Sequence, residues 1–203
     1  RYCRETIAFH LAVDGRHMVA NAVAALAVAE ALGGPRAAAI AALASFQAPE
    51  GRGLTVRLGP PERPLLLIDQ SYNANSASMA AALDVFSRQA APGGRKVLVL
   101  GDMLELGAQG PALHAALRDL VLAAGADRIY LVGRDMAALS EALGPSRVTA
   151  HAQTIEEAMG AILAGLAYGD AVMVKGSKGV RLAGLVEKIR ERFSGAPEGA
   201  RAP

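Results

Sequence analysis

The chain has 203 residues, 52% of them hydrophobic, and 21 Lys and Arg against 19 Asp and Glu give a formal net charge of +2. This composition can bury a core, which excludes a wholly disordered chain, and the balanced charge argues against an electrostatic nucleic-acid binder. A single cysteine, Cys3, excludes a disulfide framework, and no apolar run reaches the roughly 18 residues of a membrane-spanning helix. Without a signal peptide, and starting at Arg1 in mid-pattern, the chain is expected to be a soluble, cytoplasmic piece of a longer protein.

The first 50 residues differ from the rest in their pattern of apolar residues. Apolar alternation predicts a strand at 2–13, and helical periodicity predicts helices at about 17–32 and 36–46. The stretch 47–53 (QAPEGRG) is rich in Pro and Gly and is the best linker candidate in the chain. We therefore place a domain boundary at residue 50.

Beyond the linker, strand-like and helix-like segments alternate. The strands are apolar throughout, which is typical of strands buried on both faces, and the alternation indicates a parallel sheet covered by helices. We predict an α/β fold over 51–193, a Rossmann-like, mostly parallel sheet with helices on both faces, followed by a flexible tail at 194–203. The expected strands are 54–58, 64–69, 96–101, 128–132, 147–150 and 171–175, and the expected helices are 76–91, 111–124, 136–143, 155–166 and 178–193.

Such a sheet binds its ligands at the carboxyl ends of its strands, so the loops there are the candidate sites. The loop Asp69–Asn75 (DQSYNAN) is polar enough to hold a ribose, a phosphate or a peptide, although a helix cap and an Asx turn would explain part of it. Gly101–Gly107 (GDMLELG) carries two acids between glycines, or is simply a turn with a charged helix entrance. Lys175–Gly179 (KGSKG) does not match the Walker A pattern, but its two lysines could bind an anion. The alternative is that this loop is only the solvated start of a helix.

No complete catalytic set is visible from residue types and spacing. The chain contains neither a nucleophile elbow nor a dinucleotide fingerprint after a strand, and its four histidines never occur at the spacing of a helical metal pair. His114 lies inside a helical segment, where a satisfied structural histidine is the simpler interpretation.

Taken in order, the strings LLLIDQSYNANSASMAAALDVF and VLVLGDMLELG, then His114, then VMVKGSKG resemble the C-terminal domain of the Mur ligases. They resemble in particular the branch of that family that adds D-alanyl-D-alanine. Upstream, GRHMVANAVAALAVAEALGG and the linker GRG resemble the end of the family's central ATPase domain, which implies that 1–50 is a piece of that domain. The resemblance covers nearly all of the chain except its first dozen residues and its tail.

The resemblance implies an ATP-dependent amide ligase that adds D-alanyl-D-alanine to UDP-N-acetylmuramoyl-tripeptide in peptidoglycan precursor synthesis. ATP would phosphorylate the terminal carboxylate of the tripeptide, the amine of the dipeptide would attack the acyl phosphate, and the tetrahedral intermediate would lose phosphate to leave the amide. Mg²⁺ would neutralise the phosphates. In the family, the P-loop, the magnesium ligands and the UDP-sugar domain lie upstream, so this chain alone is expected to be inactive. A monomer is expected.

The resemblance also implies roles for single residues. His17 and Asn21 match the histidine and asparagine near the adenine, and Arg52 matches the arginine that reaches the ATP phosphates, which makes it the catalytic candidate. Gln70 stands where the family has an acid near the ribose, so the ribose role falls to Gln70 or is shared with Asp69. Further nucleotide candidates are Tyr72, Asn73 and Asn75, and the two asparagines are also substrate candidates.

The acceptor dipeptide is expected against the other two loops, by analogy with sister ligases. A lysine or the serine of KGSKG is a suitable partner for its carboxylate, and an acid of GDMLELG could steer its amine. These acceptor candidates are Asp102, Glu105, Lys175, Ser177 and Lys178.

Two alternatives stay open. One is another ATP-dependent amide ligase of the same fold, of the diaminopimelate-adding or folylpolyglutamate type. The diaminopimelate-adding enzymes carry an Asp-Asn-Pro-Arg acceptor string, which does not occur in this chain. The other is a non-catalytic nucleotide-binding module, which would bind a dinucleotide tightly without any further domain.

Overall fold

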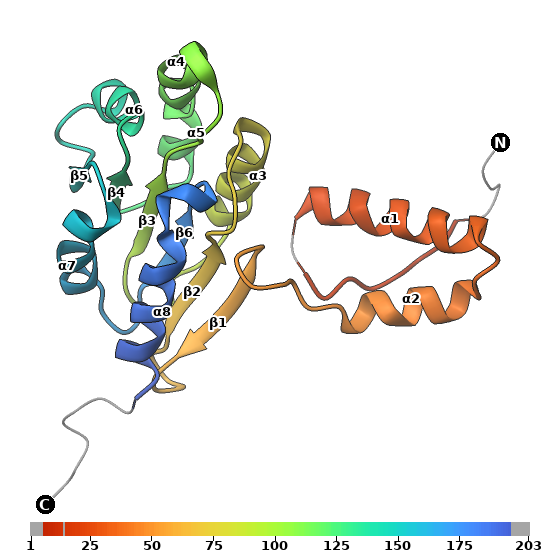
Figure 1. Ribbon diagram of the computed structural model, residues 1–203. Coiled ribbons are helices and arrows are strands. Elements are labelled where there is room, and N and C mark those ends of the chain that lie inside the picture. Colours follow the sequence, from red (N-terminus) through yellow and green to blue (C-terminus); the bar gives the residue numbers. More distant parts are fainter. Residues whose placement is uncertain (1–5, 14, 196–203) are drawn as a thin grey trace, which may run out of the picture. The chain divides into compact units, whose positions relative to one another are not determined.

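The computed structural model describes residues 6–13 and 15–195, and the chain divides into two compact units, Arg1–Ala48 and Pro49–Pro203 (Figure 1). The first unit holds helices α1 (Arg16–Ala31) and α2 (Arg36–Ser45), close to their predicted bounds. The strand predicted at 2–13 is wrong for residues 6–13, which are irregular, and the rest of that range lies outside the described residues. A strand needs a hydrogen-bonded neighbour, and the described part of this unit offers no second extended segment to pair with.

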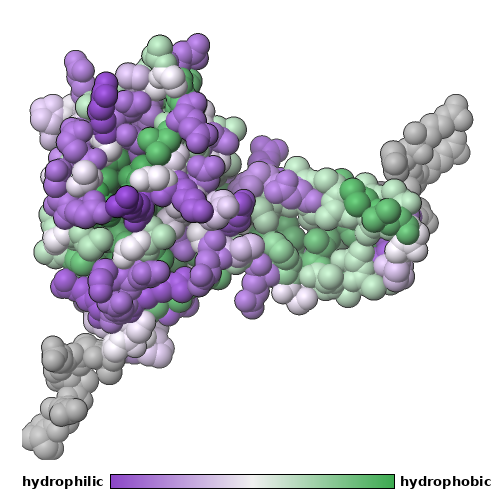
Figure 2. Space-filling view, in the orientation of Figure 1, coloured by the Kyte–Doolittle hydropathy of each residue, from purple (hydrophilic) through white to green (hydrophobic). Residues whose placement is uncertain are grey.

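The first unit buries few of its apolar side chains. Among its described hydrophobic residues only Ala22 and Ala48 are buried, whereas Val23, Val28 and Leu32 are 53%, 59% and 83% exposed. Figure 2 shows apolar surface over this unit, while the visible face of the second unit is largely hydrophilic. The first unit therefore has an apolar composition without a core of its own.

The second unit is built on a six-stranded sheet with the strand order β1-β2-β6-β3-β4-β5. Only β1 runs antiparallel to its neighbour, at one edge, so the predicted mostly parallel sheet is confirmed. β6, which follows the other described strands in the chain, lies between β2 and β3. The strands are β1 (Leu54–Leu58), β2 (Leu65–Gln70), β3 (Lys96–Gly101), β4 (Arg128–Val132), β5 (Ala150–Ala152) and β6 (Ala171–Lys175).

Helices cover both faces of this sheet (Figure 1). Helices α3, α5 and α6 pack on the face that carries Leu98 and Leu100, and α7 and α8 pack on the face that carries Val97 and Val99. Successive residues of one strand thus enter two separate cores, which is why the inner strands β2, β3, β4 and β6 are mostly apolar, whereas the edge strand β1 exposes Thr55 and Arg57. The helices of this unit are α3 (Ser76–Ser87), α4 (Gly110–Ala115), α5 (Arg118–Ala123), α6 (Met136–Leu143), α7 (Ile155–Gly165) and α8 (Leu182–Phe193).

Some predicted elements differ from the observed ones. The helix predicted at 111–124 is split into α4 and α5, because the backbone tightens at Leu117, whose N–H donates to the carbonyl of His114 three residues back. The helix predicted at 178–193 starts as a short 3-10 turn, and α8 begins only after Arg181, whose φ of +63° is left-handed. The strand predicted at 147–150 lies further along the chain, where β5 (Ala150–Ala152) pairs with β4, and this pairing determines its bounds.

The predicted tail at 194–203 lies outside the described residues except for its first two positions. Within the described residues, no helix is both long enough and apolar enough to cross a membrane.

Candidate functional site

Three loops that carry the polar motifs meet at the carboxyl ends of β2, β3 and β6. Ser177, which is 4% exposed, donates its backbone N–H to the carbonyl of Asp102 over 2.9 Å. Its Oγ accepts the N–H of Leu104 at 2.9 Å and donates to the carbonyl of Ala74 at 3.3 Å. One buried serine therefore connects all three loops, and its hydroxyl is already occupied.

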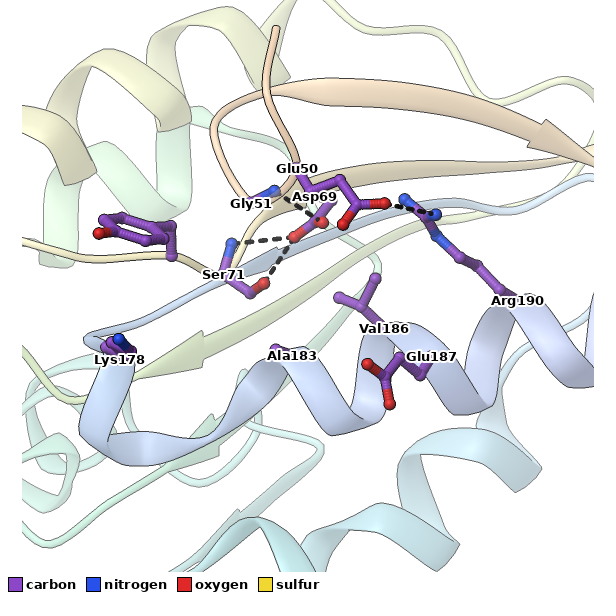
Figure 3. Close-up of a pocket in the computed structure, with 10 residues that line it drawn as sticks. Glu50, Gly51, Asp69, Ser71, Lys178, Ala183, Val186, Glu187 and Arg190 are labelled. Atoms are coloured by element: carbon purple, nitrogen blue, oxygen red, sulfur yellow. Dashed lines mark hydrogen bonds and ion pairs between the residues drawn. The ribbon is translucent and has the colours of Figure 1, made fainter.

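The Asp69 carboxylate holds the linker against the loop that follows β2. Its Oδ1 accepts the N–H and the hydroxyl of Ser71 at 3.0 and 2.6 Å, and its Oδ2 accepts the N–H of Gly51 at 2.9 Å (Figure 3). Gly51 has a φ of +72°, and a Cβ there would lie 2.8 Å from the Cβ of Tyr72. The linker thus passes so close to this loop that only glycine fits.

Asp102 is 6% exposed, and its carboxylate caps the start of α6. It accepts the backbone N–H of Met136 at 2.8 Å and that of Asp135 at 3.2 Å. A Cβ at Gly133 would run into this carboxylate, so the glycine is required by the close packing. Asp102 therefore organises the protein, and its carboxylate does not face solvent.

His114 is fully buried and fixes the loop that begins at Asp102. Its Nε2 accepts the N–H of Met103 at 2.9 Å, and its Nδ1 lies 2.7 Å from the carbonyl of Gly110, to which it donates. Both ring nitrogens are satisfied by backbone groups. The interpretation of His114 as a satisfied structural histidine is confirmed.

Lys175 is only 2% exposed, and its Nζ donates to the carbonyl of Asn73 at 3.0 Å. Burial lowers the pKa of this lysine to about 8, because the charged ammonium loses its hydration. A ligand carboxylate can contact this ammonium only if the loop around Asn73 moves.

The two asparagines of the loop after β2 are exposed and make local bonds. Asn75 is the N-cap of α3, where its side chain accepts the N–H of Ser78 at 2.8 Å while the Ser78 hydroxyl accepts the N–H of Asn75 at 3.0 Å. Asn73 Oδ1 accepts the N–H of Ala74 at 2.9 Å. The capping interpretation thus accounts for the oxygen of Asn75, and both amide N–H₂ groups remain available for a ligand.

A second set of candidates stays on the surface. The Arg52 guanidinium carbon lies 4.1 Å from the ring centroid of Tyr72, and Lys178 Nζ lies 6.0 Å from it. Glu105 is exposed and has a φ of +66°, a strained conformation for a residue other than glycine. Gln70, which ends β2, is half-buried instead, and its side chain is packed near Gly53.

A pocket of about 260 Å³ adjoins this set between the linker and α8. Figure 3 shows Lys178 at one end of it and, at the other, the Glu50–Arg190 ion pair, which measures 3.4 Å between Oε1 and Nη1. Its lining residues are Glu50, Gly51, Asp69, Ser71, Tyr72, Lys178, Ala183, Val186, Glu187 and Arg190.

Sequence reasoning missed the part of the pocket that α8 contributes. Ala183, Val186, Glu187 and Arg190 recur at the spacing of one helix face, and this is the signal that would have grouped them. Nothing in their residue types marks that face as a pocket wall.

The adenine candidates lie in the other unit. His17 and Asn21 are both exposed and stand one turn apart on α1. The described part of the chain contains no cluster of three or more His, Cys, Asp or Glu side chains that could hold a metal ion.

Comparison with known proteins identifies the family. Residues 51–178 match the family described as Mur ligase, glutamate ligase domain. The UDP-N-acetylmuramoyl-tripeptide–D-alanyl-D-alanine ligase of Escherichia coli (strain K12) is 35% identical over 181 residues, which are 89% of this chain and 38% of that protein. The corresponding ligase of Haemophilus influenzae is 29% identical over 88% of this chain and 38% of its own length.

A crystal structure of MurF from Acinetobacter baumannii superposes with a TM-score of 0.76 at 33% identity, over 90% of this chain and 40% of that one. The chain thus spans about two fifths of the length of the relatives it resembles. Because the family match alone covers more than half of the residues, the chain belongs to the Mur ligase, glutamate ligase domain family.

Proposed function

We propose that this chain is the C-terminal part of an ATP-dependent ligase that adds D-alanyl-D-alanine to UDP-N-acetylmuramoyl-tripeptide in the cytoplasm. The observation that carries the proposal is the 35% identity to the Escherichia coli ligase of that name over 89% of the chain. A match of that extent includes the sheet and the loops at its strand ends. The addition would complete a peptidoglycan precursor.

The charges at the strand-end edge suit the phosphate side of this reaction. ATP, accompanied by Mg²⁺, would supply the phosphoryl group that activates the carboxylate of the tripeptide. Arg52 is exposed and lacks a carboxylate within 4.0 Å among the described residues, so its guanidinium is available to the phosphates. A donor of this kind stabilises the charge that develops during phosphoryl transfer. His17 and Asn21, which share one exposed face of α1, would contact the adenine.

The acceptor side divides into residues that shape the site and residues that face it. Asp102, Lys175 and Ser177 are buried and bonded to neighbouring loops, so we assign them to shaping. Glu105 is exposed and makes no ion pair within the described residues, which leaves its carboxylate able to attract the ammonium group of the dipeptide.

The test uses the longer protein that contains this chain. ADP release is measured with UDP-N-acetylmuramoyl-tripeptide and one acceptor at a time, namely D-alanyl-D-alanine, diaminopimelate or glutamate. Release that requires both the tripeptide and D-alanyl-D-alanine is the expected result. Release with diaminopimelate or glutamate instead would establish another amide ligase of this fold, and nucleotide binding without acceptor-dependent release would establish a non-catalytic module.

A further inference from the structure

Tyr72 is an aromatic side chain that stays 44% exposed where three segments meet. Arg52 comes from the linker and Lys178 from the turn after β6, yet both positive groups lie near the Tyr72 ring, at 4.1 and 6.0 Å from its centroid. The negative face of an aromatic ring attracts a cation within about 6 Å of its centroid. The ring therefore attracts both cations.

The carboxylates near this ring do not neutralise the two cations. Asp69 already accepts three hydrogen bonds, from the N–H groups of Gly51 and Ser71 and from the Ser71 hydroxyl, and Glu50 pairs with Arg190. Glu187 also lines the pocket, but no described carboxylate lies within 4.0 Å of the Arg52 or Lys178 nitrogens. Two like charges near one ring repel each other, so the arrangement favours binding of an anion between them.

The backbone keeps the ring and the guanidinium together. The Tyr72 N–H donates to the carbonyl of Gly51 at 3.1 Å, and the Gly51 N–H donates to Asp69. Since Arg52 directly follows Gly51, its backbone is bound to the same loop that carries the ring. The backbone bonds thus fix the main chain of Arg52 beside the ring, and the 4.1 Å contact with the ring orients the guanidinium before a ligand arrives, which lowers the entropy lost on binding.

We propose that Tyr72 is a positioning residue that holds Arg52 and Lys178 as a two-cation site for a chain of phosphates. A single carboxylate is neutralised by one cation, whereas a polyphosphate presents charged oxygens to both at once. The inference rests on the proposed function for one point, that the anion is the triphosphate of ATP. It also assigns Lys178 to the phosphates rather than to the carboxylate of the acceptor dipeptide.

The experiment titrates inorganic tripolyphosphate into the 203-residue chain and follows amide signals by ¹H–¹⁵N NMR, which reports binding and folding together. Arg52→Gln and Lys178→Gln should each weaken binding about 10-fold or more, as expected for charge-assisted contacts. Tyr72→Leu should weaken it about 5-fold, within the range of a lost cation–π contact, whereas Tyr72→Phe should bind as the wild type does. In the Arg52→Gln background, Tyr72→Leu should have little further effect, because the ring acts through the guanidinium.

The matched control is Lys188→Gln, which removes the same charge from α8, where Lys188 is exposed and pairs with Glu191 at 2.7 Å. This variant should change tripolyphosphate binding less than about 2-fold, as expected for an exposed, paired charge that is screened by salt. N-acetyl-D-alanyl-D-alanine, which has one carboxylate and no ammonium, should bind at least about 10-fold more weakly than tripolyphosphate. If it binds more tightly, the site is a carboxylate site.

The inference is overturned if the wild-type chain does not bind tripolyphosphate, or if Tyr72→Leu binds as tightly as the wild type. Should Tyr72→Leu fail to fold, Arg52→Lys keeps the charge but loses the planar group on the ring, and wild-type affinity for that variant would equally overturn the inference. The readout does not depend on ligase activity. A longer protein without ligase activity would refute the proposed function and leave this binding pattern intact.

Discussion

At the carboxyl end of the sheet, the polar side chains form two groups with different partners. The inner group is at most 6% exposed and bonded to the backbone of other loops, and it comprises Asp69, Asp102, His114, Lys175 and Ser177. The outer group is exposed and faces solvent, and it comprises Arg52, Tyr72, Glu105 and Lys178. A polar motif at a strand end thus combines residues that hold the loops together with residues that remain able to contact a ligand. Substitutions should therefore separate stability from binding.

The largest expected effect is on stability, at His114 in the inner group. His114→Ala removes two backbone hydrogen bonds and leaves a cavity at a fully buried position, so the free energy of unfolding should fall by about 3 kcal/mol or more. The free energy of unfolding is measured by urea denaturation monitored by circular dichroism. Glu105→Ala, the control in the outer group, should change it by less than about 0.5 kcal/mol. Equal losses in both variants would show that the two groups do not differ in their contribution to stability.

The next effect is on turnover, at Arg52 in the outer group. In the longer protein, Arg52→Ala should lower kcat about 100-fold or more, the usual consequence of losing one electrostatic donor to a developing negative charge. The same variant should change the unfolding free energy by less than about 1 kcal/mol, because the contact with Tyr72 is exposed. Steady-state kinetics and urea unfolding together test this, and unchanged turnover would remove Arg52 from the site.

A smaller loss of stability is expected at Asp102. Asp102→Ala leaves the N–H groups of Met136 and Asp135 without their acceptor, which should destabilise the protein by about 1–3 kcal/mol. Asp102→Asn keeps one acceptor oxygen and should lose less. If Asp102→Ala lowered turnover in the longer protein with no loss of stability, Asp102 would belong to the outer group.

The smallest expected effect is a change in pH dependence at Lys175. Burial lowers the pKa of Lys175 in the folded protein to about 8, from about 10.4 when unfolded, so between these values only the unfolded chain binds the proton. This lysine therefore makes the unfolding free energy rise with pH, on the order of 1 kcal/mol between about pH 8 and 9.5. Lys175→Met should lack that rise in urea unfolding at stepped pH. An identical pH dependence in variant and wild type would show that the ammonium is hydrated.

Much of the fold could be predicted because its signal is local. The apolar runs of β3, β4 and β6 have the same bounds in the sequence prediction and in the structure, since strands buried on both faces show little polar interruption. β1 also has its predicted bounds, although Thr55 and Arg57 on one of its faces are exposed. The strand predicted at 2–13 failed for its described part, because strand periodicity without a pairing partner does not make a strand. The break between α4 and α5 at Leu117 was also not predicted, because the Ala- and Leu-rich sequence on both sides of it favours a continuous helix.

The loops of the candidate site could be located, but the division between inner and outer groups could not. It depends on partners that are distant in the chain: Asp69 with Gly51, and Ser177 with Leu104. Residue type identifies a carboxylate or a hydroxyl, but only the fold decides whether a backbone N–H already occupies it. The pocket wall on α8 could not be predicted for the same reason, because only the fold brings α8 next to the linker.

The place of β6 in the sheet has a consequence for synthesis. β6 (Ala171–Lys175) follows the other described strands in the chain and is therefore synthesised after them. It pairs with both β2 and β3, so without it the pair β1-β2 and the set β3-β4-β5 are not joined by hydrogen bonds. Pairing across about 100 residues of chain slows folding, because the loop must close before the contact is gained. While β6 is still being made, the edges of β2 and β3 are open to other chains. Insertion of β6 is thus both the step that joins the two parts of the sheet and the step that ends the risk of aggregation along those edges.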